Sequence, residues 1–220
     1  MILRNIFLMK GIIVRVFNKL LMLLNRNRLA FNFRYQNKIV DYLVDKSFDD
    51  RALYFSNFKE YMKCSVDYAK QFDNRINIEC GVGKGGNARL WCKLMPEQTI
   101  YGFDSFQGFK EDPVTESVWS PFQSKFKTWE KPVLPNNYHI IEGFLEDTFE
   151  PFYNKIRSEK EFDCIFVHLD MDIYQPTKHF LEIIRKEKIK TIICFDELIN
   201  YEGFENHEWR AFNEEILKHN

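Results

Sequence analysis

The chain has 220 residues, of which 45% are hydrophobic and 29% charged, and its formal net charge is −1. This length suits one domain with a sizeable core. The near-zero charge argues against a nucleic-acid-binding protein held mainly by phosphate contacts. The five cysteines are odd in number and form no C-x-x-C pair, which favours free thiols in the reducing cytoplasm over a disulfide framework.

Residues 1–34 carry seven basic residues and no acidic one, with the basic and apolar positions on opposite faces of a helical wheel. We expect this basic amphipathic helix to pack on its own domain or on a sister subunit of a homo-oligomer, and peripheral membrane contact is the alternative. No apolar run here exceeds five residues, so neither a spanning helix nor a signal peptide is expected. With helical sequence over 37–69, residues 1–70 are predicted to form a helical leader and cap.

From residue 71 onward, short apolar strands alternate with amphipathic helices. The strands are predicted at 76–79, 99–104, 138–143, 163–170 and 191–196, and the helices at 84–94, 149–159, 177–187 and 207–218. Such alternation predicts an α/β domain over 71–220, with a Rossmann-like, mainly parallel sheet and helices on both faces. One long insertion, 105–137, holds four prolines and no clear period, and we interpret it as a lid.

Acidic residues stand at or near the ends of four of the five predicted strands: Glu79, Asp104, Asp170 and Asp196. In parallel sheets the ligand binds beyond the carboxyl ends of the strands. Four carboxylates on this one edge repel each other unless cations or hydroxyls lie among them. The pattern therefore predicts a ligand site there.

The first predicted strand leads into the glycine-rich stretch "IECGVGKGG", which has an acid-x-G-x-G-x-G spacing from Glu79. Such a turn suits either a nicotinamide dinucleotide or S-adenosylmethionine, and Asp104 could bind ribose hydroxyls in both cases. Glu79 would repel a pyrophosphate but suits a cationic amino-acid end. The acidic strand ends also suit a metal and a hydroxyl substrate, so S-adenosylmethionine is favoured.

Two stretches, "IECGVGKGGNARLW" and "YGFDSFQGF", resemble the first two motifs of class I S-adenosylmethionine-dependent methyltransferases. Two later ones, "VHLDMDIYQPTKHFLEII" and "CFDELINYEG", are similar to the macrocin O-methyltransferase-like group of sugar O-methyltransferases. The resemblance covers roughly residues 76–212. It implies a metal-assisted O-methyltransferase that acts on the hydroxyl of a sugar-like small molecule.

Carried to this sequence, the resemblance implies specific roles. Metal ligands for Mg²⁺ or another divalent cation would be Asp170, Asp196 and Glu197. Asp172 would be the catalytic base, with His207 as its rival. The expected cofactor-binding residues are Glu79, Gly81, Gly83, Gly85, Asp104, Ser105 and Asp147.

The sequence departs from the group's pattern in two places. Glu197 replaces the more usual aspartate, so the metal geometry could differ. No sequence follows the helix predicted at 207–218 to form the final antiparallel hairpin of the seven-stranded fold, so we expect a shortened sheet or a truncated chain.

Two other classes of function stay open. An NAD-dependent sugar oxidoreductase or epimerase would use a Tyr-x-x-x-Lys pair, and Tyr174 and Lys178 have that spacing but the wrong acids around them. A non-catalytic scaffold of the same fold would have no reason to keep mutually repelling carboxylates. His168, inside an apolar strand, is expected to be an ordinary core histidine with its hydrogen bonds satisfied.

Overall fold

The computed structural model describes residues 55, 57–110, 130–196, 198 and 204–219. All of them belong to one compact unit, residues 54–198 and 203–220. The amphipathic helix predicted at 1–34, most of the predicted lid and the predicted metal ligand Glu197 lie outside the described residues. These three predictions therefore stay predictions.

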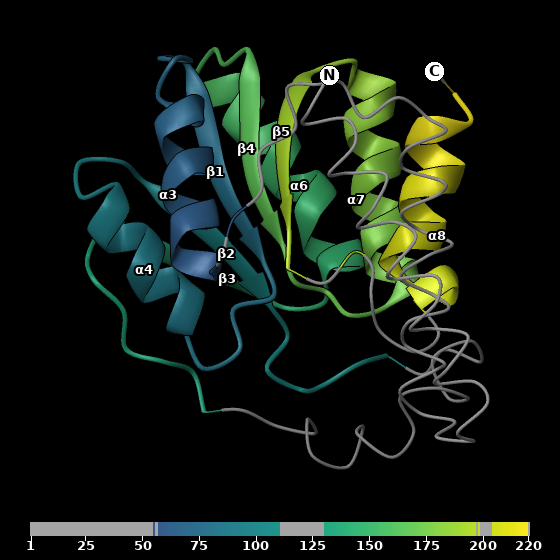
Figure 1. The fold of residues 1–220 in the computed structure, drawn as a ribbon, viewed down its shortest axis with the longest axis horizontal. Helices are drawn as coiled ribbons and strands as arrows, with labels where there is room; N and C mark the ends of the chain where they lie inside the picture. The colour runs from purple at the N-terminus through teal and green to yellow at the C-terminus, as the bar shows by residue number, and fades with distance from the viewer. Residues whose placement is uncertain (1–54, 56, 111–129, 197, 199–203, 220) are drawn as a thin grey trace, which may run out of the picture. The chain divides into compact units, whose positions relative to one another are not determined.

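The described chain is built on a five-stranded sheet in which every strand is parallel to its neighbours, in the order β3-β2-β1-β4-β5 (Figure 1). This confirms the predicted α/β, Rossmann-like fold. The strands are β1 (Arg75–Cys80), β2 (Ile100–Asp104), β3 (Tyr138–Glu142), β4 (Cys164–Leu169) and β5 (Lys190–Phe195). The chain order reverses between β1 and β4, and the carboxyl edge beside such a reversal is where ligands bind in these sheets.

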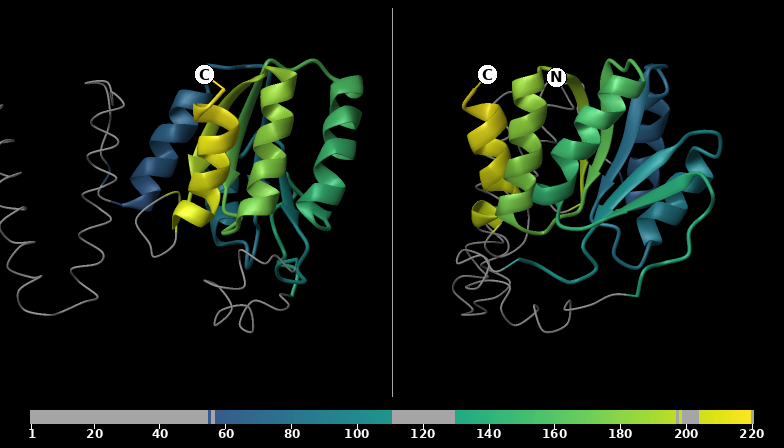
Figure 2. Two further views of the ribbon diagram at one scale, coloured as in Figure 1. Left: turned by 90° about the vertical axis from the view of Figure 1, so that its right-hand side faces the viewer. Right: turned by 180° about the vertical axis from the view of Figure 1, so that it is seen from behind.

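Helices cover both faces of the sheet (Figure 2). One face carries α3 (Phe58–Ala69) and α4 (Gly86–Leu94). The other carries α6 (Leu145–Glu159), α7 (Tyr174–Glu187) and α8 (Glu208–Phe212), preceded by a short 3-10 turn, η1 (Phe204–Asn206), and extended by a π-helical turn, η2 (Asn213–Leu217). In the part of the chain that the structure describes, no helix is both long and apolar enough to cross a bilayer.

The neighbouring strands β1 and β4 are buried on both faces of the sheet, so their side chains pack into two cores, one on each face. Ile76, Ile78 and Cys80 of β1 pack toward α6 and α7. On the opposite face, Trp91 of α4 stacks on Phe166 of β4 with ring centroids 4.6 Å apart. The period-two alternation of a strand then puts Glu79 of β1 and His168 of β4 on the α3/α4 face as well.

Candidate cofactor cavity and metal site

A cavity of about 320 Å³ opens at the carboxyl ends of β1, β2, β3 and β4. This is the edge that the acidic residues predicted, and the volume lies at the lower end of the range for small-molecule sites. Six of the predicted site residues line the cavity: Gly81, Gly83, Asp104, Ser105, Asp170 and Asp172. Glu79, Gly85, Asp147, Asp196 and His207 do not line it.

The glycine-rich turn connects β1 to α4 and forms one wall of the cavity. At Gly81, with φ of 93°, a Cβ atom would lie 1.8 Å from the carbonyl oxygen of Asp170, so only glycine fits. At Gly83, with φ of 50°, a Cβ would meet nothing within 4 Å, and the backbone is open to the cavity. Gly85 instead precedes α4 as its N-cap and faces Pro132 and Leu134.

Asp104, the last residue of β2, holds this turn in place. Its Oδ2 accepts hydrogen bonds from the backbone N–H groups of Val82 (2.9 Å) and Gly83 (2.7 Å). Its Oδ1 accepts one from the N–H of Phe106 (2.7 Å). A carboxylate offers about four acceptor positions, so one remains for a ligand hydroxyl in the cavity. The neighbouring Ser105 hydroxyl donates to the carbonyl of Gly108 (3.0 Å) and so shapes the adjoining loop.

The segment after β3 presents a different acid from the one predicted. Glu146 lines the cavity, whereas Asp147 is largely exposed and forms an ion pair with Lys110 at 2.9 Å. Both acids lie in the first turn of α6, where a helix N-terminus favours negative charge. Glu146 is therefore the nearer candidate for a cofactor contact.

Glu79 lies beneath the cavity and is fully buried. Its Oε2 accepts a hydrogen bond from the hydroxyl of Tyr138, and its Oε1 lies 3.5 Å from Nδ1 of His168. Tyr138 starts β3 and reaches Glu79 across β2 at Gly102, where a Cβ atom would come within 2.1 Å of the tyrosine oxygen. Glu79 is therefore held by Tyr138 and His168 and does not line the cavity.

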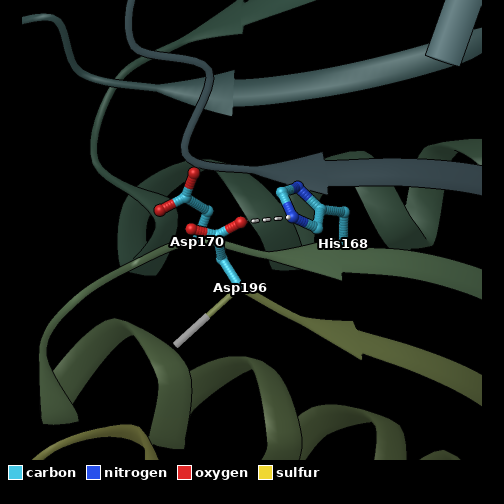
Figure 3. Close-up of side chains that lie close together, drawn as sticks. All are labelled: His168, Asp170 and Asp196. Carbon is cyan, nitrogen blue, oxygen red and sulfur yellow. Dashed lines mark ion pairs between the residues drawn. The ribbon is translucent and has the colours of Figure 1, made fainter. Parts of the chain in front are cut away.

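His168, Asp170 and Asp196 form a group that could hold a metal ion, because one ligand atom from each lies within 4.8 Å of the others. Figure 3 shows the His168 ring pointing toward the Asp196 carboxylate, with the Asp170 carboxylate beside it. Nε2 of His168 lies 3.5 Å from Oδ1 of Asp196. Alternation explains the grouping, since Asp170 lies two residues beyond His168, and Asp196 lies two beyond Cys194, the register partner of His168 in β5.

His168 is a core residue, as expected, but its hydrogen bonds are not satisfied within the described structure. The side chain is fully buried, but neither ring nitrogen makes a hydrogen bond within the described structure. The rings of Phe58 and Trp91, with centroids 5.8 and 6.0 Å away, surround the imidazole on the α3/α4 face. On this face the imidazole thus lies beside two aromatic rings, and the carboxylates of Glu79 and Asp196 lie 3.5 Å from its two nitrogens.

The carboxylates of the group favour a positive charge beside them, and without a metal the protonated His168 ring supplies one, whose proton a metal ion would have to displace. Burial, and then the neighbouring Asp196 and Asp172, raise the pKa of Asp170 to about 8. For His168, burial disfavours the charged ring, but Asp196 and Glu79 outweigh it and raise its pKa to about 9. The carboxylates therefore resist being charged together until positive charge joins them.

The turn between Asp170 and Ile173 is tight, and it places Asp172 in the cavity wall. Asp172 has φ of 60°, a conformation that aspartate tolerates better than most residues, and the N–H of Ile173 donates to the carbonyl of Met171 at 2.6 Å. The N–H of Met171 donates to Oε1 of Glu208, a carboxyl whose pKa burial raises well above its usual range. Glu208 thus braces the turn that carries Asp172.

The rival base, His207, is fully buried at the start of α8. Tyr174 and Lys178, the pair expected of an oxidoreductase, do not line the cavity either. The Tyr174 hydroxyl donates to Glu214, and Nζ of Lys178 donates to the tyrosine oxygen at 2.9 Å. Through these contacts with Glu214, Tyr174 and Lys178 connect α7 to η2.

Sequence reasoning missed several residues at or under the cavity: Asn87, Tyr138, Glu146, His168 and Glu208. One available signal was period-two spacing, because it puts His168 on the same face of β4 as Asp170. Another was the acidic first turn of α6, which marks a helix start.

No protein-family model matches the chain, and a search among curated proteins also finds no match.

Proposed function

We propose that this protein is an S-adenosylmethionine-dependent, metal-assisted O-methyltransferase whose acceptor is a hydroxyl of a sugar-like small molecule. The charge of the cavity wall is the observation that carries the proposal. Four carboxyl groups line it, from Asp104, Glu146, Asp170 and Asp172, against the two amines of Lys84 and Lys110. An acidic wall suits a cationic sulfonium cofactor better than the pyrophosphate of a dinucleotide.

The walls of the cavity also offer the contacts that such a cofactor needs. The open backbone at Gly83 permits close approach of the ligand, and the remaining acceptor position of Asp104 suits a ribose hydroxyl. The resemblance of the glycine-rich turn and the second strand to methyltransferase motifs supports the same assignment.

Methyl transfer from a sulfonium is an in-line displacement: the methyl carbon leaves sulfur as the acceptor oxygen attacks it. The enzyme's own residues must align the acceptor and take up its proton. Asp172, a carboxylate in the cavity wall two residues from Asp170, is our candidate for the proton acceptor. A divalent cation held by His168, Asp170 and Asp196 would lower the pKa of the acceptor hydroxyl when bound.

Calorimetric titration tests the cofactor assignment. We expect S-adenosylhomocysteine to bind, Asp104→Ala to weaken that binding by about 1.5–3 kcal/mol, and NADH to bind weakly or not at all. A matched control is Glu142→Gln, which removes an exposed carboxylate at the end of β3 that pairs only with the exposed Lys131 among the described residues. Tight NADH binding without S-adenosylhomocysteine binding would establish the oxidoreductase alternative, and binding of neither would favour a scaffold.

A further inference from the structure

The buried imidazole of His168 faces carboxylates without making a hydrogen bond to them in the described part of the chain. The ring is fully buried, and neither nitrogen has a hydrogen bond within the described structure. Leaving a buried polar atom without a partner is costly, so such groups usually mark an ion, a water or a catalytic role. Here the Nε2 atom faces two carboxylates at the edge of the cavity (Figure 3).

A charged imidazole that merely bridges carboxylates is the simplest alternative. Charge-assisted N–H···O bonds of that kind close to about 2.7–2.9 Å. Both contacts of His168 are longer, at 3.5 Å to Glu79 and 3.5 Å to Asp196. The 3.5 Å spacing of Nε2 and Oδ1 of Asp196 instead suits two ligands of one ion, because bonds of about 2.1 Å from each would meet at a near-tetrahedral angle.

The other ring nitrogen also faces a carboxylate, although at 3.5 Å it makes no hydrogen bond to it in the described structure. Ligating histidines usually give their second N–H to a carboxylate, which fixes the tautomer and the ring orientation. Nδ1 of His168 faces Oε1 of Glu79, and Tyr138 donates its hydroxyl to the other oxygen of that carboxylate. Gly102 keeps this path across β2 open, since any side chain there would collide with Tyr138.

We infer that His168 ligates a first-row transition-metal ion together with Asp170 and Asp196, and that Glu79 and Tyr138 orient its ring. The purpose of this metal, to activate the acceptor hydroxyl, rests on the proposed function. One imidazole and two carboxylates form a mixed nitrogen–oxygen set, which suits Mn²⁺, Fe²⁺ or Zn²⁺. Mg²⁺ prefers oxygen ligands and retains its water, so it would gain little from the imidazole.

The test measures metal binding directly, without cofactor or acceptor, on the full-length protein. Mn²⁺ and Mg²⁺ are titrated by calorimetry, and pulsed electron paramagnetic resonance of the Mn²⁺ complex detects a directly bonded imidazole nitrogen. We expect Mn²⁺ to bind at least about tenfold more tightly than Mg²⁺, with a clear nitrogen coupling. Mn²⁺ binding without that coupling, or no Mn²⁺ binding at all, would overturn the inference.

Variants distinguish the metal-ligating residue His168 from the residues that orient its ring. His168→Gln should abolish the nitrogen coupling and weaken Mn²⁺ binding by at least about tenfold, and Tyr138→Phe should weaken it about tenfold while keeping the coupling. Glu142→Gln, an exposed acid at the end of β3, should change neither. If His168→Gln does not fold, the coupling in the unchanged protein decides the question.

Failure of this inference and failure of the proposed function give different results. Nitrogen-coupled Mn²⁺ in a protein that does not bind S-adenosylhomocysteine would keep the metal site and remove the methyltransferase. Binding of S-adenosylhomocysteine with no nitrogen coupling would keep the methyltransferase assignment and remove His168 as a metal ligand.

Discussion

Removing the carboxylate of Asp104 should loosen the glycine-rich turn even when no cofactor is present. Its oxygens accept three backbone hydrogen bonds, at 2.9, 2.7 and 2.7 Å. A bond to a charged group contributes about 1.5–3 kcal/mol, and water can reach these partly buried N–H groups after the side chain is removed. We therefore expect Asp104→Ala to lower the free energy of unfolding by about 2–4 kcal/mol, less than the sum of three bonds.

Asp104→Asn should cost less, about 1–2 kcal/mol. Its one carbonyl oxygen can still accept from Val82 and Gly83, but its amide nitrogen then faces the N–H of Phe106. Urea unfolding followed by circular dichroism measures both values, with the exposed-acid variant Glu142→Gln expected within about 0.5 kcal/mol of the unchanged protein. If Asp104→Ala is equally close to the unchanged protein, the carboxylate does not hold the turn and the reasoning fails.

Three further predictions address the base, the acid stability and the N-terminal residues. Asp172→Asn should slow methyl transfer about 10²–10⁴-fold while metal and cofactor still bind, as measured with labelled S-adenosylmethionine and a screened sugar acceptor. If the Asp172→Asn variant is fully active and the His207→Ala variant is inactive, His207 is the base. Glu214 accepts hydrogen bonds from Tyr174 and Arg210, and these lower the pKa of its carboxyl from 4.5 to about 2. The stabilisation that Glu214 gives is therefore complete above pH 4.5 and is lost as the pH falls through about 2. Glu214→Gln should therefore cost about 1–2 kcal/mol in urea unfolding at pH 7 and less at pH 3, and an equal cost at both would contradict the ion pair. For residues 1–34, we expect the intact protein not to co-sediment with anionic vesicles, and co-sedimentation would support the membrane alternative instead of packing.

The order of strands and helices could be predicted because each element carries its own periodicity and its own terminal acid or glycine. The predicted start of α6 at residue 149 was four residues late, since α6 begins at Leu145. The first turn of α6 is polar, and Asp147, interpreted from the sequence as a cofactor ligand, lies there with Glu146, where acidic residues mark a helix N-terminus.

The burial of Glu79 could not be predicted from local sequence. Its position one residue before the end of β1 suggested the cavity edge, but its partner Tyr138 is 59 residues away and reaches it only because β3 lies beside β2 and Gly102 leaves space. The carboxylate neighbours of His168 could not be predicted for a similar reason. An apolar strand suggests core packing, and only the register of β4 with β1 and β5 brings the ring between two carboxylates.

A crystal structure of the protein with S-adenosylhomocysteine and Mn²⁺ would locate both the cofactor product and the metal ion. We predict density for S-adenosylhomocysteine in the cavity between the glycine-rich turn and Asp172, with a ribose hydroxyl on Asp104. We also predict an anomalous peak for Mn²⁺ within bonding distance of His168, Asp170 and Asp196. A cavity that stays empty of S-adenosylhomocysteine at saturating concentration, or one that takes up NADH in its place, would contradict the methyltransferase assignment.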